Sequence, residues 1–373
     1  MISDAVDLRK VRRALVVKLR HHGDVLLTSP VFTVLKARAP HAAIDALVYD
    51  ETAEMLTLHP AIDTIHTVSR KWRGLGAGRR TLEELRLFRA LRERRYDLLV
   101  HLTDHPRAAW LVRALAIEAS VAPERAGRWW RKTFTHRFPV LKNGRRHTVE
   151  MHLDALRRIG IQPGPQERKL VLEPGAPAVA HVDSLMRSYG LAQGRFIHVH
   201  PNSRWDFKCW PAASVAVMID ALESRGWRVV VTSSPAPLER AYVVEIFERM
   251  RSRPLDLSGA LTLKQLAALT SQARLFVGVD SAPMHIAAAM GTPVVALFGP
   301  SGDIEWAPWQ VAHRIVASDA FACRPCGYDG CGGGKISECL TAISCAQVLT
   351  AIDGLLCADY RASSSAVRAP LLL

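Results

Sequence analysis

The chain has 373 residues, which is long for one compact core, so two domains of somewhat under 200 residues each are expected. Its hydrophobic content of 49% is typical of a globular protein, and no apolar leader or run of about 18 uncharged apolar residues is present, so we expect a cytoplasmic protein without a membrane span. The net charge of +14 lies entirely in residues 1–170, which hold 32 Lys and Arg against 18 Asp and Glu.

This basic half indicates an anionic partner. Nucleic acid, an anionic lipid surface and an anionic substrate all fit, and composition alone does not choose among them. Solvated arginines of an Arg-rich proteome are the alternative interpretation.

The first half of the chain is predicted to alternate strands with helices, a pattern typical of a parallel sheet covered on both faces. The predicted strands are 14–19, 43–49, 65–68 and 97–102, and the predicted helices are 25–38, 51–58 and 81–95.

The second half repeats this pattern after a segment rich in proline and glycine, Pro163 to Pro177. We therefore expect domains over residues 1–180 and 181–355 and a tail over 356–373. Two doubly wound domains that face a central cleft would bind ligands at the carboxyl ends of their strands. The predicted strands are 196–199, 228–232, 276–279 and 294–298, and the predicted helices are 212–225, 238–251 and 264–273.

The stretch FVGVDSAPMHIAAAMGTPVVALFGP, Phe276 to Pro300, reads as strand, turn, helix and strand. Asp280 or Ser281 is predicted to cap the helix, and Pro283 suits its first turn. A helix start favours a phosphate because its amides carry partial positive charge, and His285 would lie near that ligand. An ordinary strand-helix-strand crossover is the alternative.

A second informative segment, KLRHHGDVLLTSP, begins at Lys18. The turn that contains Gly23 and Asp24 ends a strand, so Asp24 is expected to project into the cleft as a general base or to act only as an N-cap. The cationic or titratable residues of this turn suit an acceptor that bears phosphates or carboxylates, or are simply solvated: Lys18, Arg20, His21 and His22.

In the second half, HVHPNSRWDFKCWP follows a strand and precedes a helix. Asn202 and Ser203 can hydrogen-bond phosphate oxygens, and Lys208 can neutralise a diphosphate. Glu239 begins a helix and is placed to bind ribose hydroxyls or to act as a helix-start carboxylate. A polar loop with a solvated lysine is the alternative for this segment.

Cysteines and aromatic residues form two further clusters. Free thiols are the expected state of the cysteine-rich loop, and a metal site is the alternative, on Cys323, Cys326, Cys331 and Cys339. Trp129 and Trp130 lie among basic residues, as does Trp72, which suits the interface of an anionic membrane. Single-stranded nucleic acid also fits them, but no RNA-binding signature accompanies them.

Taken together, KLRHHGDVLLTSP and VDSAPMHIAAAMGTPVVALFGPS resemble the ADP-heptose:lipopolysaccharide heptosyltransferases of glycosyltransferase family nine. The resemblance covers about residues 12–350. The motif KLRHHGD and the cysteine-rich segment CRPCGYDGCGGGKISECLT look most like the heptosyltransferase III branch.

The resemblance implies the α/β GT-B fold, in which the N-terminal Rossmann-like domain takes a lipid-linked acceptor and the C-terminal one takes ADP-heptose. Asp24 matches the family's catalytic base, and Ser203 and Lys208 match the groups that hold the diphosphate. Glu239 matches the ribose-binding acid less closely, and Leu261 lies near the position that meets adenine. The donor-binding turn would comprise Asp280, Ser281, Ala282, Pro283, Met284 and His285.

The implied reaction is inverting transfer from ADP-L-glycero-β-D-manno-heptose to a heptose of the lipid A-linked lipopolysaccharide inner core, with no metal or other cofactor. The protein would act at the anionic inner leaflet, on the cytoplasmic face of the inner membrane, without binding nucleic acid. Another family-nine transferase with a different core acceptor, or a non-catalytic nucleotide-sugar or nucleic-acid-binding protein, remains the alternative.

Overall fold

The computed structural model describes residues 4–140 and 146–366, with side chains described up to residue 357. The chain divides into two compact units, Met1–Glu173 and Pro174–Leu373, where the sequence indicated a boundary near residue 180. Helix α13 (Cys345–Ala366) continues through residue 356, at which a separate tail was expected, and residues 367–373 lie outside the described residues.

The first unit is built on a six-stranded parallel sheet in the order β3-β2-β1-β4-β5-β6. Val16 of β1 pairs with Ala46 on one side and with Val100 on the other, which places β1 at the centre. The sequence did not indicate the last two strands, which are short. The strands are β1 (Arg13–Lys18), β2 (Ala43–Tyr49), β3 (Thr64–Val68), β4 (Leu98–His101), β5 (Ala119–Pro123) and β6 (His136–Phe138).

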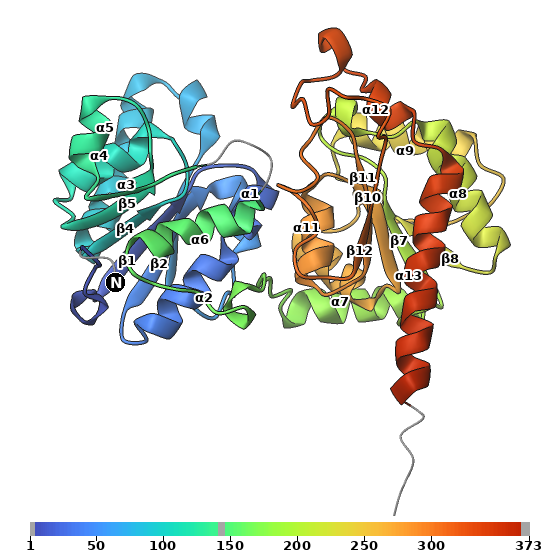
Figure 1. Cartoon of the computed structure of the whole chain (residues 1–373), viewed down its shortest axis with the longest axis horizontal. Helices are drawn as coiled ribbons and strands as arrows, with labels where there is room; N and C mark the ends of the chain where they lie inside the picture. Colours follow the sequence, from blue (N-terminus) through green and yellow to red (C-terminus); the bar gives the residue numbers. More distant parts are fainter. Residues whose placement is uncertain (1–3, 141–145, 367–373) are drawn as a thin grey trace, which may run out of the picture. The chain divides into compact units, whose positions relative to one another are not determined.

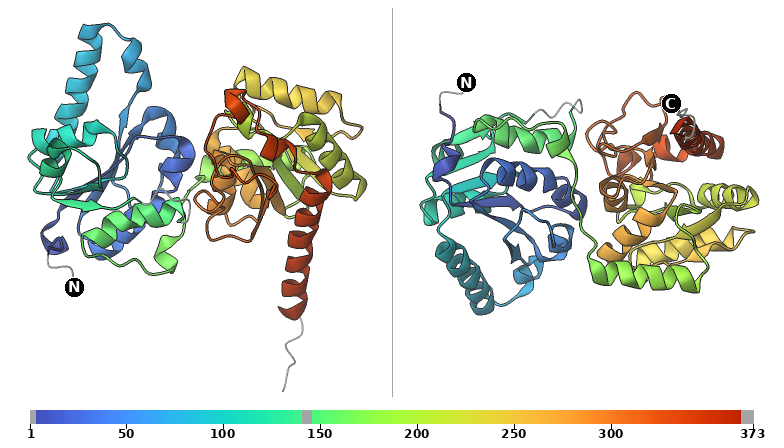
Figure 2. Two further views of the ribbon diagram at one scale, coloured as in Figure 1. Left: turned by 45° about the horizontal axis from the view of Figure 1, so that its top comes forward. Right: turned by 90° about the horizontal axis from the view of Figure 1, so that it is seen from below.

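Helices cover both faces of this sheet (Figures 1 and 2). On one face, α3 (Ala77–Arg94), α4 (Pro106–Ala114) and α5 (Arg128–Thr133) pack their apolar side chains against Leu15 and Val17. On the other, α2 (Ser29–Arg38) lies beside α6 (Thr148–Arg158).

Two helical predictions in this unit need correction. The single helix predicted over 25–38 is two helices, α1 (His22–Leu26) and α2, because Pro30 lies in the first turn of α2, where a missing amide is tolerated, and so restarts the helix. The helix predicted over 51–58 is the shorter 3-10 helix η2 (Asp50–Met55).

The second unit repeats the architecture with a parallel sheet in the order β12-β11-β10-β7-β8-β9. Gly278 of β10 lies so close to its neighbour that an added Cβ would stand 2.8 Å from the carbonyl oxygen of His200, so this position needs glycine. The strands are β7 (Phe196–His200), β8 (Arg228–Val231), β9 (Leu255–Asp256), β10 (Leu275–Val279), β11 (Val294–Phe298) and β12 (His313–Ala317).

The helices of this unit again form two layers (Figure 1). One face is covered by α8 (Ala212–Ser224), α9 (Pro237–Glu248) and α13, and the other by α7 (Ala176–Ser188), α10 (Leu263–Gln272) and α11 (Ala282–Ala289). The short helix α12 (Glu338–Thr341) precedes α13. Within the described part of the chain, none of these helices has the length and apolar character needed to cross a bilayer.

Each sheet reverses its strand order beside its central strand, between β1 and β4 in the first unit and between β7 and β10 in the second. Loops that leave neighbouring strands at such a point separate to opposite faces of the sheet and open a crevice at the carboxyl edge. The segments that carry Asp24, Lys208 and Ser281 follow β1, β7 and β10, so the fold brings each candidate group to a switch point.

A buried carboxylate joins β2 to the end of α3 in the first unit. Asp45 is 0% exposed and accepts two hydrogen bonds from the Arg94 guanidinium, at 2.7 and 2.9 Å, and one from the Tyr96 hydroxyl at 2.7 Å. Burial alone would raise the pKa of Asp45, but the neighbouring His66 and the hydrogen bonds from Arg94 and Tyr96 outweigh it and lower that pKa to about 2.

We expect Asp45→Asn to lower the free energy of unfolding by about 3 kcal/mol, the lower end of the range for a broken buried pair because Arg94 is partly exposed. The folded pKa lies below the ordinary value of 3.8, so the contribution of Asp45 is present above that pH and is lost as the pH falls toward about 2. Urea unfolding across this pH range measures both effects. Asp353→Asn, which breaks the exposed pair with Arg225, should change stability by less than about 0.5 kcal/mol.

Candidate functional site

The start of α11 forms one side of the candidate site in the second unit. Ser281 is the N-cap residue, in extended conformation, and Pro283 lies in the first turn as predicted. The capping prediction itself was wrong: the Ser281 side chain forms no capping hydrogen bond, and its hydroxyl oxygen is buried without a hydrogen-bond partner among the described residues. A polar group left in this way next to a helix start is suited to an anionic ligand.

Asp280 forms an ion pair instead of a cap. Its carboxylate accepts a hydrogen bond from the Lys208 ammonium at 2.6 Å, and its side chain is only 8% exposed. Lys208 ends the short helix η5 (Asp206–Lys208), so the pair joins the loop after β7 to the turn after β10. An ammonium has three N–H donors, which leaves Lys208 able to bind a diphosphate while it holds Asp280.

The loop after β7 is held against the start of α9. Asn202 is 1% exposed, and its amide nitrogen donates to the backbone carbonyl of Glu239 at 2.9 Å. Its side-chain oxygen is buried and accepts no hydrogen bond from the residues that the structure describes. Ser203 is 7% exposed and accepts from the Trp205 amide. The predicted phosphate loop and the predicted ribose-binding residue are therefore neighbours.

The remaining residues that were predicted to bind the nucleotide sugar differ in exposure. Met284 is 0% exposed and packs in the core with Phe276, so only its backbone can face a ligand. His285 is 3% exposed, with its ring tilted against Trp306 at 6.4 Å between centroids. Leu261 is half-buried before α10, and Ala282 and Pro283 are half-buried at the start of α11.

Asp24 belongs to the first turn of α1 in the first unit, where His21 is the N-cap residue. The alternative prediction that Asp24 is only the N-cap residue is therefore wrong. Its carboxylate oxygen lies 3.5 Å from the Lys18 ammonium nitrogen, and its side chain is 20% exposed. The Asp24 carboxylate is thus paired with a cation. It is still reachable from solvent, and a general base must be reachable by its substrate.

Lys18 lies beneath Asp24 and is 5% exposed. Its ammonium donates to the backbone carbonyl of Leu102 at 3.2 Å and lies 2.9 Å from Nε2 of His152. Burial lowers the pKa of Lys18, although the neighbouring Asp24 opposes this shift. This geometry favours a role for Lys18 in positioning Asp24. The sequence had indicated instead that Lys18 contacts the acceptor substrate directly. His152 was missed because one histidine on an amphipathic helix carries no distinctive sequence signal.

The other residues of this turn lie at the surface or near it. Arg20 is exposed and contacts Asp104 at 3.2 Å, and His21 is exposed. His22 and Gly23 are half-buried, and Nε2 of His22 lies 2.7 Å from the backbone oxygen of Glu51.

A groove that sequence reasoning did not indicate lies between α3 and α4. Its volume is about 780 Å³, and Leu85 and Trp110 line it with exposed fractions of 46% and 65%. A smaller cavity of about 150 Å³ shares Arg80 and Arg107 with it. It adds Arg70 and Arg73, which follow β3, and His105, which follows β4. Apolar and cationic surfaces therefore adjoin in this unit.

The predicted aromatic pair is only partly at the surface. Trp130 is 3% exposed, and its indole nitrogen donates to the Pro123 carbonyl at 2.9 Å. The prediction that Trp130 lies at a membrane interface was therefore wrong, because its ring packs in the core of the first unit. Trp129 is 38% exposed and lies 5.5 Å from Trp110 between ring centroids. Trp72 is half-buried against the same core.

The cysteine-rich loop contains no disulfide bond. All seven cysteines are unbridged, and Cys339 is buried whereas Cys323 and Cys331 are exposed. In residues 4–140 and 146–357, no three His, Cys, Asp or Glu side chains are arranged to hold a metal ion.

Comparison with known proteins agrees with this fold. The profile of glycosyltransferase family 9 (heptosyltransferase) matches residues 84–336. Lipopolysaccharide heptosyltransferase 3 of Escherichia coli is 37% identical over 296 residues, which cover 78% of this chain and 85% of that protein.

Two solved structures share the architecture. A glycosyl transferase family 9 protein from Veillonella parvula has a TM-score of 0.80 at 24% identity and covers 95% of this chain and 99% of its own. The E. coli heptosyltransferase WaaC with ADP-2-deoxy-2-fluoro heptose has a TM-score of 0.68 at 20% identity and covers 92% and 99%. The fold is that of the two-domain α/β GT-B glycosyltransferases. The chain belongs to glycosyltransferase family 9, the heptosyltransferase family.

We expect Lys208→Met to weaken binding of inorganic pyrophosphate by about 10- to 100-fold, because a charge-assisted hydrogen bond to the anion is lost. Isothermal titration calorimetry measures the affinity, and thermal unfolding verifies that the variant is folded. The control Lys169→Met removes an exposed lysine from the first unit and should leave the affinity unchanged. Equal affinity of a folded Lys208→Met variant would exclude Lys208 from the anion site.

Proposed function

We propose that the protein transfers L-glycero-D-manno-heptose from ADP-heptose to a heptose of the lipopolysaccharide inner core. The observation that carries this proposal is the 37% identity to E. coli lipopolysaccharide heptosyltransferase 3. Two features of the site support it: a solvent-accessible carboxylate at the switch point of the first unit, and a lysine beside a helix start in the second.

The second unit would bind the donor. Lys208, Ser203 and the start of α11 would hold the diphosphate of ADP, with Ser281 supplying a hydroxyl that is still able to hydrogen-bond. Asn202 would donate its second amide N–H to a phosphate oxygen, Glu239 would contact the ribose, and Leu261 would lie near adenine. The solved E. coli WaaC with an ADP-heptose analogue supports the choice of this donor. Because the ammonium and the helix start neutralise the departing diphosphate, the reaction would need no metal ion.

Asp24 would act as the general base in the first unit. It takes the proton from the acceptor hydroxyl, whose oxygen attacks the anomeric carbon on the face opposite ADP. The bond between that carbon and the diphosphate oxygen breaks, its electron pair leaves with ADP, and the anomeric configuration inverts. Arg20, His21, His22 and Gly23 surround the carboxylate and would contact the anionic acceptor.

The acceptor would be presented by the anionic inner leaflet at the cytoplasmic face of the inner membrane, without participation of nucleic acid. The charge of residues 1–170 supports this interaction, as does the groove between α3 and α4, where Leu85 and Trp110 expose apolar surface beside arginines. Trp129 of α5 extends this apolar surface through its contact with Trp110. Aromatic and aliphatic side chains with neighbouring cations are typical of surfaces that bind anionic bilayers.

Asp24→Asn is expected to reduce heptose transfer by about 10²- to 10⁴-fold, because the amide cannot accept the proton, while ADP binding stays unchanged. Product formation from ADP-heptose and truncated lipopolysaccharide cores is measured by mass spectrometry, and ADP binding by calorimetry. The exposed Asp319→Asn variant is the control and should retain full activity. Undiminished turnover by Asp24→Asn would remove Asp24 from the base role.

The double variant Leu85→Ser/Trp110→Ser is expected to bind anionic phosphatidylglycerol vesicles at least about tenfold more weakly, because two apolar contacts with the bilayer are lost. Vesicle sedimentation at low and high salt measures the binding. The control Val217→Ser/Val244→Ser alters side chains of similar exposure, 56% and 55%, in the second unit and should bind normally. Equal binding of the original protein to neutral and anionic vesicles would contradict the electrostatic part of the proposal.

A further inference from the structure

We propose that His152 is a positioning residue for transfer: through its Nε2 lone pair it holds the Lys18 ammonium against Asp24, and so keeps the base oriented and paired with a cation. The proposal rests on the assignment of Asp24 as the base. His152 comes from α6, about 130 residues along the chain from β1 and α1, so only the folded structure brings the three side chains together.

The Lys18 ammonium has an acceptor for each of its three N–H groups. These are the Leu102 carbonyl at 3.2 Å, His152 Nε2 at 2.9 Å and the Asp24 carboxylate at 3.5 Å. A buried ammonium is costly unless its donors are satisfied, so each acceptor helps to keep the proton on Lys18. The shortest of the three contacts is the one with His152.

The environment of His152 determines which ring nitrogen carries the proton. Nδ1 lies 3.0 Å from the backbone oxygen of Leu27, and a carbonyl can only accept a hydrogen bond, so Nδ1 is protonated and Nε2 presents its lone pair to Lys18. Burial lowers the pKa of His152 well below its ordinary value, and the Lys18 charge lowers it further. The neutral ring is therefore the stable form.

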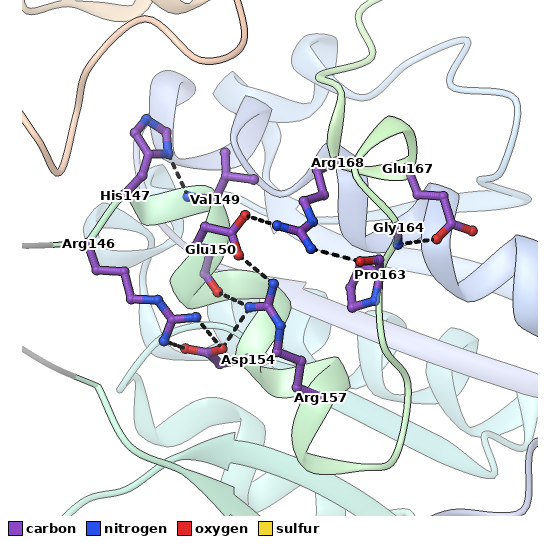
Figure 3. Close-up of polar contacts among 10 residues, drawn as sticks. All are labelled: Arg146, His147, Val149, Glu150, Asp154, Arg157, Pro163, Gly164, Glu167 and Arg168. Atoms are coloured by element: carbon purple, nitrogen blue, oxygen red, sulfur yellow. Dashed lines mark hydrogen bonds and ion pairs between the residues drawn. The ribbon is translucent and has the colours of Figure 1, made fainter.

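Helix α6 carries an ion-pair network that holds it in place (Figure 3). Asp154 accepts hydrogen bonds from Arg146 and Arg157, and Glu150 pairs with Arg157 and Arg168. Arg168 in turn donates to the Pro163 carbonyl at 2.9 Å, which ties the helix to the segment that follows it.

The His152 side chain of α6 is restrained by burial. His152 is 5% exposed there, so the ring cannot rotate into solvent without displacing its neighbours. The ion-pair network restrains helix α6, and the Leu27 contact restrains the His152 ring, so both restrict the movement of His152 relative to Lys18.

Other charged and titratable groups near Lys18 and His152 come from β4 and from the segments that follow β1 and β4 or precede α6. Arg20, after β1, lowers the pKa of Lys18, and Asp104, after β4, raises it. His101 of β4 is neutral because burial lowers its pKa to about 3. His147, before α6, acts on His152 only weakly. Asp24 and His152 are therefore the two side chains in direct contact with the ammonium.

The variant His152→Leu tests the proposal. We expect kcat for heptose transfer to fall roughly tenfold, with little change in KM for ADP-heptose, because the donor site lies in the other unit. The alkaline limb of the pH profile of kcat should move to lower pH, since an ammonium that has lost an acceptor gives up its proton more easily. His152→Gln, whose side-chain oxygen can accept from Lys18, should restore the limb.

A matched control separates positioning from packing. His59 is also buried in the first unit, at 4% exposure, and its ring lies 5.7 Å from that of Phe32. His59→Leu should lower the melting temperature without moving the alkaline limb. If His152→Leu does not fold, His152→Phe provides a ring of similar size without the acceptor and is expected to give the same shift.

A readout without turnover distinguishes this proposal from the proposed function. The NMR signal of the Lys18 side-chain nitrogen, assigned by its loss in Lys18→Met, should titrate at lower pH in His152→Leu than in the original protein. Titration of Lys18 and an alkaline limb that both stay unchanged would overturn the role of His152. Retained turnover by Asp24→Asn together with a shifted Lys18 titration would instead refute the base assignment and leave the Lys18–His152 contact established.

Discussion

The central strand of each parallel sheet is the constraint on which the rest of the structure depends. β1 lies between β2 and β4, and β7 lies between β8 and β10. The loops that follow β1 and β4 therefore leave toward opposite faces of their sheet, as do the loops that follow β7 and β10. The carboxyl edge is opened at that point, and the backbone that follows is free to present polar groups. Both halves of the proposed reaction, the base and the diphosphate site, are located where the strand order reverses.

Three carboxylates in the described part of the chain, Asp45, Asp280 and Asp24, are each paired with a cation, and the consequence depends on the exposure of the pair. Asp45 and Arg94 lie away from the candidate site and stabilise the first unit. Asp280 and Lys208 join two loops of the second unit, and the ammonium keeps donors available for an anion. Asp24 remains 20% exposed above Lys18, which suits proton transfer. The same kind of ion pair therefore serves stability, anion binding and, as proposed, catalysis.

Much of the fold was predictable because apolar runs and helix periodicity are local signals. The strands over 43–49 and 294–298 agree with the structure residue for residue. The strands β5 (ASVAP) and β6 (HRF) were missed because each contains only one large apolar residue and so gives no apolar run. Trp130 was misplaced since its basic sequence neighbours suggested a surface, whereas tertiary packing buries the ring.

The sequence by itself determined the alternation of strands and helices, the two units and the family, because each is written in local patterns or in motifs such as KLRHHGD. It also indicated Asp24, Lys208 and the α11 turn as candidates. Only the tertiary structure decided what surrounds them: that Lys208 pairs with Asp280 and that His152 reaches Lys18 from a distant helix. The physical reason is that hydrogen bonds and burial depend on distances between segments far apart in the chain, which no local pattern specifies.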